Sequence, residues 1–318
     1  MTNVKYYREM EKMNRGLSIF IMAFMVCVLN KCGPSRPAMK EFAFPKSKYS
    51  DWARVFENPV NIRIESLSTS IMRAQRSGIL NLENPRAAGL RDGTLRLPVF
   101  AHLLRHEKYG DYLVDAGIPV KESLPDNDGE KGEFEGDDIR MGETDWGTGS
   151  RLASLNAHPK AVFFTHLHLD HSMGIADLPS TTTLVFGARE STEPYNILNS
   201  REDLKKYLKG IKIVYTINFS QAATMPPCGP CADLLGDGSL WAISTPGHSA
   251  GHISYLVNGT AGPVLITGDA CVVRWGFEND VEPGYYSSDI ETSRKSLKML
   301  REFCSTYPRI RIIFGHEL

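Results

Sequence analysis

The sequence has no surplus of charge of either sign and few cysteines. Lys and Arg number 36 and Asp and Glu 37, so the formal net charge is −1 and no basic excess is present for binding a nucleic-acid backbone. Six cysteines in 318 residues are too few for a disulfide scaffold. The chain also lacks a collagen period, a heptad run and an internal repeat, which excludes fibrous and solenoid classes. With 42% hydrophobic residues it has the composition of a soluble α/β or α+β domain.

The first residues differ from the rest of the chain. An uncharged apolar run over 17–29 follows four basic residues, which are Lys5, Arg8, Lys12 and Arg15. The run is short for a membrane-spanning helix, which needs about 20 residues, and has the proportions of a secretory signal. Cys32 follows in a segment that resembles a bacterial lipoprotein box, although Lys31 stands where that box has a small residue. We expect export to the cell envelope or periplasm, with lipid anchoring at Cys32 an open alternative. A buried core helix or a short membrane anchor is the other interpretation.

The remaining chain divides into a tether and one folded domain. We assign 1–33 to the signal peptide, 34–60 to a tether or N-terminal segment with several prolines, and 61–318 to the domain. Strands are expected at 61–67, 97–104, 112–114, 161–165, 211–215, 240–244, 253–257, 264–267 and 310–314. Helices are expected at 151–157 and 201–209, and from a capping box of Ser288 and Glu291 to about Tyr307. The acidic stretch 121–147 is interpreted as a solvated loop. Two runs of strands, each ending in a helix, predict two packed sheets with helices outside.

Metal-binding side chains cluster directly after the strand at 161–165. His166 and His168 are two residues apart, so an extended backbone directs both rings to one side. Asp170 and His171 follow where the chain is expected to turn into a helix. Four nitrogen and oxygen ligands within six residues are typical of a divalent metal site. A structural interpretation would bury these polar groups without partners, which is unfavourable.

Further polar residues follow three later strands. His248 comes after the strand at 240–244, Asp269 after 264–267, and His316 after 310–314, each next to a glycine. One histidine alone is more often structural, and one aspartate after glycine is usually part of a turn. As a set at strand ends, these three residues are better explained as ligands that complete the site.

These motifs together resemble the metallo-β-lactamase superfamily. HxHxDH, TPGH, TGDA and FGH occur here in that order, and the segment 245–318 is similar to N-acyl homoserine lactonases. The resemblance implies an α/β (α+β) fold, the four-layer αββα sandwich, with metals at the edge of the sheets. It also implies that His166, His168 and His248 hold one metal, that Asp170, His171 and His316 hold the other, and that Asp269 bridges the two.

The resemblance implies a hydrolase that opens a lactone with a hydroxide bridging two Zn²⁺ ions, and iron, manganese or cobalt would also fit the donors. The expected substrate is a small-molecule ester or lactone, most of all an N-acyl homoserine lactone, with Asp170 or Asp269 transferring the proton. A phosphodiesterase, thioesterase, sulfatase or β-lactamase on the same scaffold is the alternative. The β-lactam-hydrolysing members generally lack an aspartate at the position of Asp269. A non-enzymatic metal protein is disfavoured because all seven ligands are present.

The same resemblance bears on several other residues. Val272 stands where the lactonases often have a substrate-binding tyrosine, and Tyr285 or Tyr286 could replace it. Asp115 resembles an aspartate that orients a ligand histidine, with a simple turn residue as the alternative. His252 is interpreted as structural, and three further histidines are interpreted as hairpin or surface residues: His102, His106 and His158. Cys228 and Cys231 lie in a proline-rich loop, where a local disulfide or two free thiols is expected rather than thioredoxin chemistry.

Overall fold

The domain is built on two β-sheets. The computed structural model describes residues 37–120, 133–134, 137–140, 146–193, 197, 207–208 and 210–318. The first sheet has nine strands in the order β1 (Ala38–Glu41), β9 (Ile213–Ile217), β8 (Thr183–Gly187), β7 (Ala161–Phe163), β4 (Gly110–Val114), β3 (Thr94–His106), β2 (Ile62–Gln75), β6 (Asp137–Arg140) and β5 (Glu133–Phe134). The second has six strands in the order β10 (Ala223–Thr224), β11 (Pro230–Asp233), β12 (Leu240–Ser244), β13 (Ile253–Gly259), β14 (Gly262–Ile266) and β15 (Arg311–Ile313).

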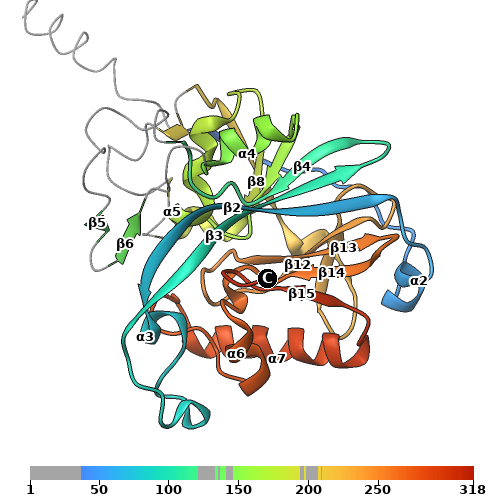
Figure 1. Ribbon diagram of the computed structural model, residues 1–318. Helices are drawn as coiled ribbons and strands as arrows, with labels where there is room; N and C mark the ends of the chain where they lie inside the picture. The colour runs from blue at the N-terminus through green and yellow to red at the C-terminus, as the bar shows by residue number, and fades with distance from the viewer. Residues whose placement is uncertain are drawn as a thin grey trace, which may run out of the picture. The chain divides into compact units, whose positions relative to one another are not determined.

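Helices cover the outer faces of both sheets (Figure 1). The α-helices are α2 (Trp52–Phe56), α3 (Arg76–Ile79), α4 (Thr148–Ser154), α5 (Leu169–Ser172), α6 (Arg274–Asn279) and α7 (Ile290–Thr306). Short 3-10 helices occur at Pro85–Ala87, Met173–Asp177, Ala188–Thr192, Phe219–Gln221 and Gly268–Ala270. α6 and α7 lie under the six-stranded sheet, whereas α4 and α5 lie on the side of the nine-stranded sheet. This is the predicted αββα sandwich, so the predicted fold class is confirmed.

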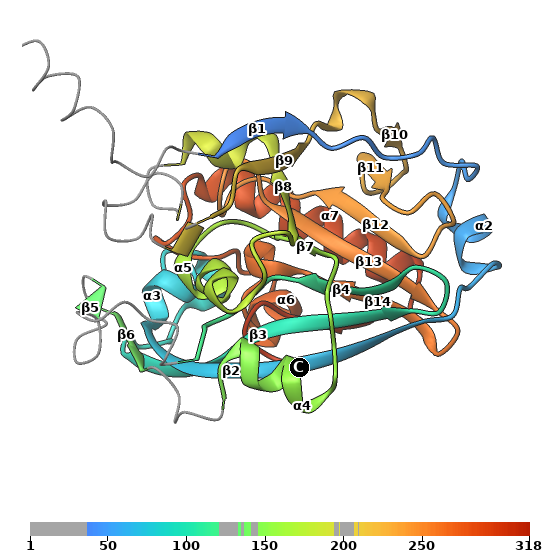
Figure 2. The ribbon, with the colours of Figure 1, turned by 90° about the horizontal axis from the view of Figure 1, so that it is seen from above.

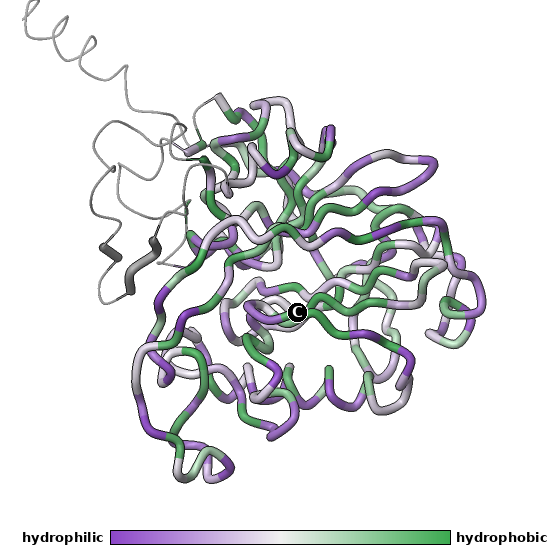
Figure 3. The backbone as a smooth tube through the Cα atoms, viewed as in Figure 1, coloured by the Kyte–Doolittle hydropathy of each residue, from purple (hydrophilic) through white to green (hydrophobic). Residues whose placement is uncertain are grey.

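The strand alternation explains why the sheets stack. In β7, Ala161 and Phe163 face the cluster between the two sheets, while Val162 faces the cluster on the other side. In β12, Ala242 faces the inter-sheet cluster, and Trp241 packs with the residues that meet α7. Figure 3 shows hydrophobic stretches along the strands of the sheets, with α7 alternating between polar and apolar positions. Each sheet face therefore buries its own apolar layer.

Residues 37–60 belong to the folded domain, which corrects the prediction of a tether over 34–60. β1 pairs in parallel with β9 at one edge of the nine-stranded sheet (Figure 2). In α2, Trp52 and Val55 have no exposed surface, and the Trp52 indole N–H donates to Met225 O at 3.0 Å. The prolines of this stretch predict an irregular segment, whereas α2 packs its apolar side chains into the domain. The buried side chains of Trp52 and Val55 hold this segment on the domain despite its prolines.

The remaining element boundaries also differ in part from the predicted ones. α7 begins after Asp289, whose carboxylate caps the Thr292 N–H at 2.9 Å, so the predicted capping box at Ser288 is one residue early. β2 and β3 are longer than expected, because they pair along most of their length around a bulge between Ser68 and Ser70. Within 121–147, β5 and β6 form strands, and β6 pairs with β2. The predicted helix over 201–209 lies almost entirely outside the described residues, as do the predicted signal peptide and Cys32. Among the described residues no helix is long and apolar enough to span a membrane.

Candidate metal centre

Seven metal-binding side chains gather at one edge of the two sheets. They come from the segment after β7, from α5, and from the loops that follow β12, β14 and β15. The structure brings together all seven predicted ligands: His166, His168, Asp170, His171, His248, Asp269 and His316. Because these strands end at the same edge, residues up to 150 positions apart in the chain meet there.

The side chains form two groups, each able to hold one ion. His166, His168 and His248 make the first group. Asp170, His171, Asp269 and His316 make the second, and the ligand atoms in each group lie within 4.8 Å of one another. The histidines and Asp170 divide as the sequence resemblance implied, whereas Asp269, which the resemblance placed between the two ions, falls in the second group.

Asp269 faces both groups. Its Oδ2 lies 3.4 Å from His248 Nε2 in the first group. Its Oδ1 lies 3.6 Å from His171 Nε2 and 3.6 Å from His316 Nε2 in the second. Asp170 Oδ2, in contrast, lies 3.3 Å from the same two nitrogens and faces the second group through that oxygen. Asp269 therefore presents one carboxylate oxygen to each of the two ligand groups.

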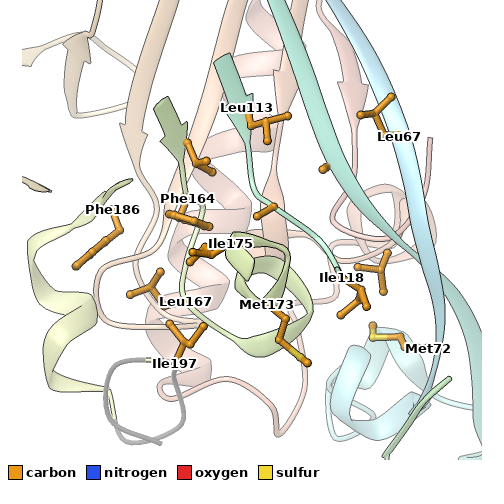
Figure 4. Close-up of a cluster of buried hydrophobic side chains, with 14 of the residues drawn as sticks. Leu67, Met72, Leu113, Ile118, Phe164, Leu167, Met173, Ile175, Phe186 and Ile197 are labelled. Atoms are coloured by element: carbon orange, nitrogen blue, oxygen red, sulfur yellow. The ribbon is translucent and has the colours of Figure 1, made fainter. Parts of the chain in front are cut away.

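Local packing directs the HxH histidines toward the site. Leu167, between the two histidines, is 2% exposed and packs with Phe164 and Ile197 in the cluster shown in Figure 4. Because side chains alternate along an extended backbone, burial of Leu167 on that side leaves the flanking rings on the other. The hydrophobic residue inside the motif is thus part of what orients the ligands.

Two glycines make room for Asp269. A Cβ on Gly315 would lie 2.1 Å from Asp269 Oδ1, so any side chain there would displace the carboxylate. Gly268 has φ +52°, a conformation that favours glycine, and a Cβ there would lie 2.7 Å from Thr165 Cβ. The glycines of TGDA and FGH therefore have a physical role beside the ligands they precede.

Hydrogen bonds to the second ring nitrogen fix three of the histidines. His171 Nδ1 donates to Asp115 Oδ2 at 2.8 Å, and His316 Nδ1 donates to Pro98 O at 2.8 Å. The Thr165 hydroxyl donates to Asp115, so the Nδ1 of the adjacent His166 must donate to Thr165 Oγ1 at 3.0 Å. Each ring therefore keeps a proton on Nδ1, so its neutral form offers the Nε2 lone pair to a metal.

The lack of hydrogen-bond partners at these Nε2 atoms shows whether the site fits metal ions. The buried side-chain atoms without a hydrogen-bond partner include His166 Nε2, His171 Nε2, His316 Nε2 and Asp269 Oδ1. Buried polar atoms without partners are rare and unfavourable. Four of them converging from different loops on one place, with only nitrogen and carboxylate donors, is the arrangement expected for divalent ions.

The two groups differ in their electrostatics. Burial lowers the pKa of His166 and of His248 well below 6.5, so these rings are neutral. Burial also lowers the pKa of His171, but the negative charges of Asp170, Asp115 and Asp269 outweigh it and raise the value well above 6.5. His316 behaves in the same way, and Asp269 and Asp170 raise its pKa to about 9 against the effect of burial. A divalent cation in the second group would replace the protons that balance these carboxylates.

A buried glutamate that sequence reasoning missed joins two ligand loops. Glu190, in the 3-10 helix after β8, is fully buried. Its Oε2 accepts from Leu167 N at 3.0 Å, and its Oε1 accepts from Gly251 N at 3.0 Å and from the Ser249 hydroxyl. Glu193 extends this contact by accepting from Ala250 N at 2.8 Å. Neither glutamate belongs to a motif, so only the folded arrangement identifies them.

Several other predicted residues take structural positions. Asp115 is 3% exposed and holds His171, which favours its predicted orienting role over a simple turn. His102 and His106 lie in β3, as expected for a hairpin, but are buried, whereas His158 is exposed. His106 Nε2 lies 2.9 Å from Asp237 in the β11–β12 loop, so this ring joins the two sheets. Burial lowers the pKa of His252 to about 3, which keeps that ring neutral.

The structure also shows the burial and contacts of Val272, the two tyrosines and the two loop cysteines. Val272 is 3% exposed and belongs to the same buried hydrophobic cluster as Leu167, and Tyr285 is 60% exposed. The Tyr286 hydroxyl accepts from Gln75 N at 3.2 Å. Cys228 and Cys231 are buried free thiols, which is one of the two expected states, and burial raises the pKa of Cys228.

Known proteins are similar to this chain in sequence. An N-acyl homoserine lactonase of a Bacillus species is 31% identical over 231 residues, which cover 70% of this chain and 83% of that protein. The N-acyl homoserine lactonase AttM of Agrobacterium fabrum is 30% identical over 187 residues, which cover 55% of this chain and 65%, just under two thirds, of that protein.

The solved structures give the same fold. A mutant of AiiA from B. thuringiensis, with N-decanoyl-L-homoserine bound at its active site, matches with a TM-score of 0.61 at 23% identity and covers 82% of this chain and 94% of that one. Residues 95–304, more than half of the chain, match the family described as the metallo-beta-lactamase superfamily. The sandwich, the order of the motifs and this match agree, and the chain belongs to the metallo-beta-lactamase superfamily.

Proposed function

We propose that the protein is a metal-dependent hydrolase that opens lactones, N-acyl homoserine lactones in particular, with two zinc ions per chain. The observation that supports it most is the position of Asp269, whose two oxygens face the two ligand groups. The donors are five histidine nitrogens and two aspartate carboxylates, a set of intermediate softness that suits zinc. When bound, such a pair of ions supplies a nucleophile from water near neutral pH and polarises a carbonyl oxygen.

Asp170 is the better of the two predicted candidates for proton transfer. Both oxygens of Asp269 face ligand groups, whereas Asp170 faces only the second group, and does so through Oδ2 alone. The Asp170 side chain is also 15% exposed, against 8% for Asp269. Its carboxylate can therefore accept a proton from the attacking water and return it to the ring oxygen that leaves as an alkoxide. His168 is the other partly exposed ligand, so the substrate is expected to approach from the side of these two residues.

The choice of a lactone depends on the relatives rather than on the geometry alone. Two ions of this kind can promote attack on phosphorus, sulfur or an amide carbon as well as on an ester. The two curated relatives above carry the name N-acyl homoserine lactonase. The presence of Asp269 also disfavours β-lactam hydrolysis, because the β-lactam-hydrolysing members generally lack this aspartate.

The experiment is turnover of the zinc-loaded protein on a panel of substrates. The panel contains short- and long-chain N-acyl homoserine lactones, a chromogenic β-lactam, a phosphodiester, a thioester and an aryl sulfate. We expect lactone opening far above the others, abolished by a chelator, and strongly reduced in Asp170→Asn at full metal content. Hydrolysis of a different member of the panel with no lactone turnover would refute the lactonase proposal and keep the metal centre.

We also propose that the protein is exported and anchored through Cys32. The support is the sequence of residues 1–33 alone, with its basic start and apolar run. Metabolic labelling with a fatty acid, followed by separation of membrane and soluble fractions, tests it. Label in the wild type but not in Cys32→Ser supports lipidation, and an unlabelled wild-type protein in the cytoplasm contradicts both parts.

A further inference from the structure

The backbone of Asp269 is held by a second histidine outside the ligand set. Asp269 N–H donates to His252 Nε2 at 3.0 Å, and His252 is 1% exposed. The other ring nitrogen, Nδ1, lies 2.9 Å from Thr245 Oγ1. From there the contacts continue to Ser254 Oγ at 3.0 Å and on to Thr267 O at 2.8 Å. Every side chain in this series is buried at 0 or 1% exposure.

The direction of every hydrogen bond in the series can be deduced. A carbonyl oxygen only accepts, so Ser254 uses its proton on Thr267 O, and the Thr245 hydroxyl must then donate to Ser254 Oγ. Thr245 has no proton left, so His252 Nδ1 donates to it. At the other end the Asp269 N–H requires an acceptor at Nε2, which gives the same tautomer. The Thr267 end and the Asp269 end of the series therefore require the same His252 tautomer, and each buried donor has an acceptor.

The glycine before Asp269 allows this approach. A Cβ on Gly268 would lie 2.8 Å from His252 Nε2, so a side chain there would push the ring away. The His252 ring also lies beside two ligand rings, with centroid distances of 5.3 Å to His166 and 6.1 Å to His248. His252 thus contacts the backbone of the shared carboxylate while it packs against the first ligand group.

We propose that His252 is a positioning residue for Asp269, acting through the hydrogen bond between its Nε2 and the Asp269 N–H. This bond fixes the backbone from which the carboxylate reaches both groups, and Thr245 and Ser254 fix the tautomer that makes it. The inference rests on the proposed metal-dependent function. Its test measures metal affinity, which does not depend on which substrate is cleaved.

Two substitutions of His252 separate the roles of the two ring nitrogens. In Gln, the carboxamide oxygen is three bonds from Cβ, as Nε2 is in His, so His252→Gln keeps an acceptor for Asp269 N–H. In Asn, the amide is two bonds from Cβ, as Nδ1 is, so His252→Asn keeps a donor for Thr245 and leaves Asp269 N–H without an acceptor. Each variant is titrated with Zn²⁺ in competition with a chromophoric chelator, and its melting temperature is recorded without metal.

We expect His252→Asn to weaken zinc binding by about 10- to 100-fold, which is the usual effect of losing an outer partner of a metal ligand. We expect His252→Gln to stay within about threefold of the wild type, at a similar melting temperature. Wild-type affinity in folded His252→Asn would overturn the proposal. Equal losses in both folded variants would also overturn it, because the ring rather than the acceptor would then be required.

A second pair and a spectroscopic signal keep the proposal testable if His252→Asn does not fold. Thr245→Val is nearly isosteric and removes the acceptor of Nδ1–H, whereas Thr245→Ser keeps it. We expect Thr245→Val to bind zinc more weakly than the wild type and Thr245→Ser to bind it equally well. Equal affinities of the two variants would contradict the proposal. In the wild type, ¹⁵N NMR of the imidazole is expected to show the His252 proton on Nδ1. A proton on Nε2 would exclude the hydrogen bond that the proposal requires.

Discussion

The hydrogen bond from His171 to Asp115 allows a sharp test of the metal centre. Asp115 Oδ1 accepts from Thr165 N at 2.7 Å, and Oδ2 accepts from His171 Nδ1 at 2.8 Å. In Asp115→Asn, Thr165 N–H keeps the amide oxygen on its side, so the amide NH₂ faces His171 Nδ1. Two donors then meet, and the ring proton is favoured on Nε2, where the metal would bind. The variant should weaken binding in the second ligand group.

The magnitude follows from the bond that is lost. A hydrogen bond to a charged group contributes about 1.5–3 kcal/mol, which corresponds to roughly 10- to 150-fold in affinity. Asp115 has φ +58°, a conformation that asparagine also tolerates, so the backbone is expected to be unchanged. Affinity is measured by chelator competition, and the tautomer of His171 by ¹⁵N NMR of its ring.

Asp280→Asn is the matched control. Asp280 has φ +56°, forms ion pairs with Arg86 and Arg301, and lies at the end of α6 rather than among the ligands. We expect a small loss of stability, of at most about 1 kcal/mol, and no change in metal affinity. The reasoning about Asp115 would be refuted if Asp115→Asn bound both ions as tightly as the wild type. It would equally fail if the control lost affinity to the same extent.

Three further outcomes are expected. Asp269→Asn should stay folded but bind fewer than two ions and lose two or more orders of magnitude in kcat, since several kcal/mol of charge stabilisation are removed; metal analysis and turnover with wild-type values would contradict its shared role. Joint replacement of Cys228 and Cys231 by serine should leave hydrolysis nearly intact at full metal content, and a large loss would show a role for the thiols. The pKa of His316 is raised to about 9 by Asp269 and Asp170 against burial, so its stabilising contribution is complete below pH 6.5 and is lost as the pH rises toward 9. The melting temperature of the metal-free protein should therefore fall over that range, and a flat profile would contradict the assignment.

The ligands could be predicted from the sequence because each lies directly after a strand. The HxHxDH motif is local, and its spacing already sets the directions of His166 and His168. The later ligands follow apolar strands and sit beside glycines, so their position at the edge of a sheet can be inferred without a structure. The shared geometry of Asp269 came from the family resemblance, and the structure supports it with distances to both groups.

The residues that support the ligands could not be found in this way. Glu190 is fully buried and accepts hydrogen bonds from loops about 20 and 60 residues away, and no spacing in the sequence predicts that approach. The tether prediction failed for a related reason. Local proline content indicated an irregular segment, whereas the burial of Trp52 depends on Met225 and on α7, which are distant in sequence.

The role of His252 follows from the sequence and the structure taken together. As a lone histidine four residues beyond a ligand, it is reasonably interpreted as structural, and its burial agrees with that. Only its contact with Asp269 N–H separates a structural histidine from one that fixes a bridging ligand. Since the hydrogen-bond directions in this series are set from both ends, a change as small as Thr245→Val is expected to reach the metal centre without touching any ligand. A metal centre built from loops at a sheet edge is therefore specified by the ligands and also by the acceptors of their backbone N–H groups.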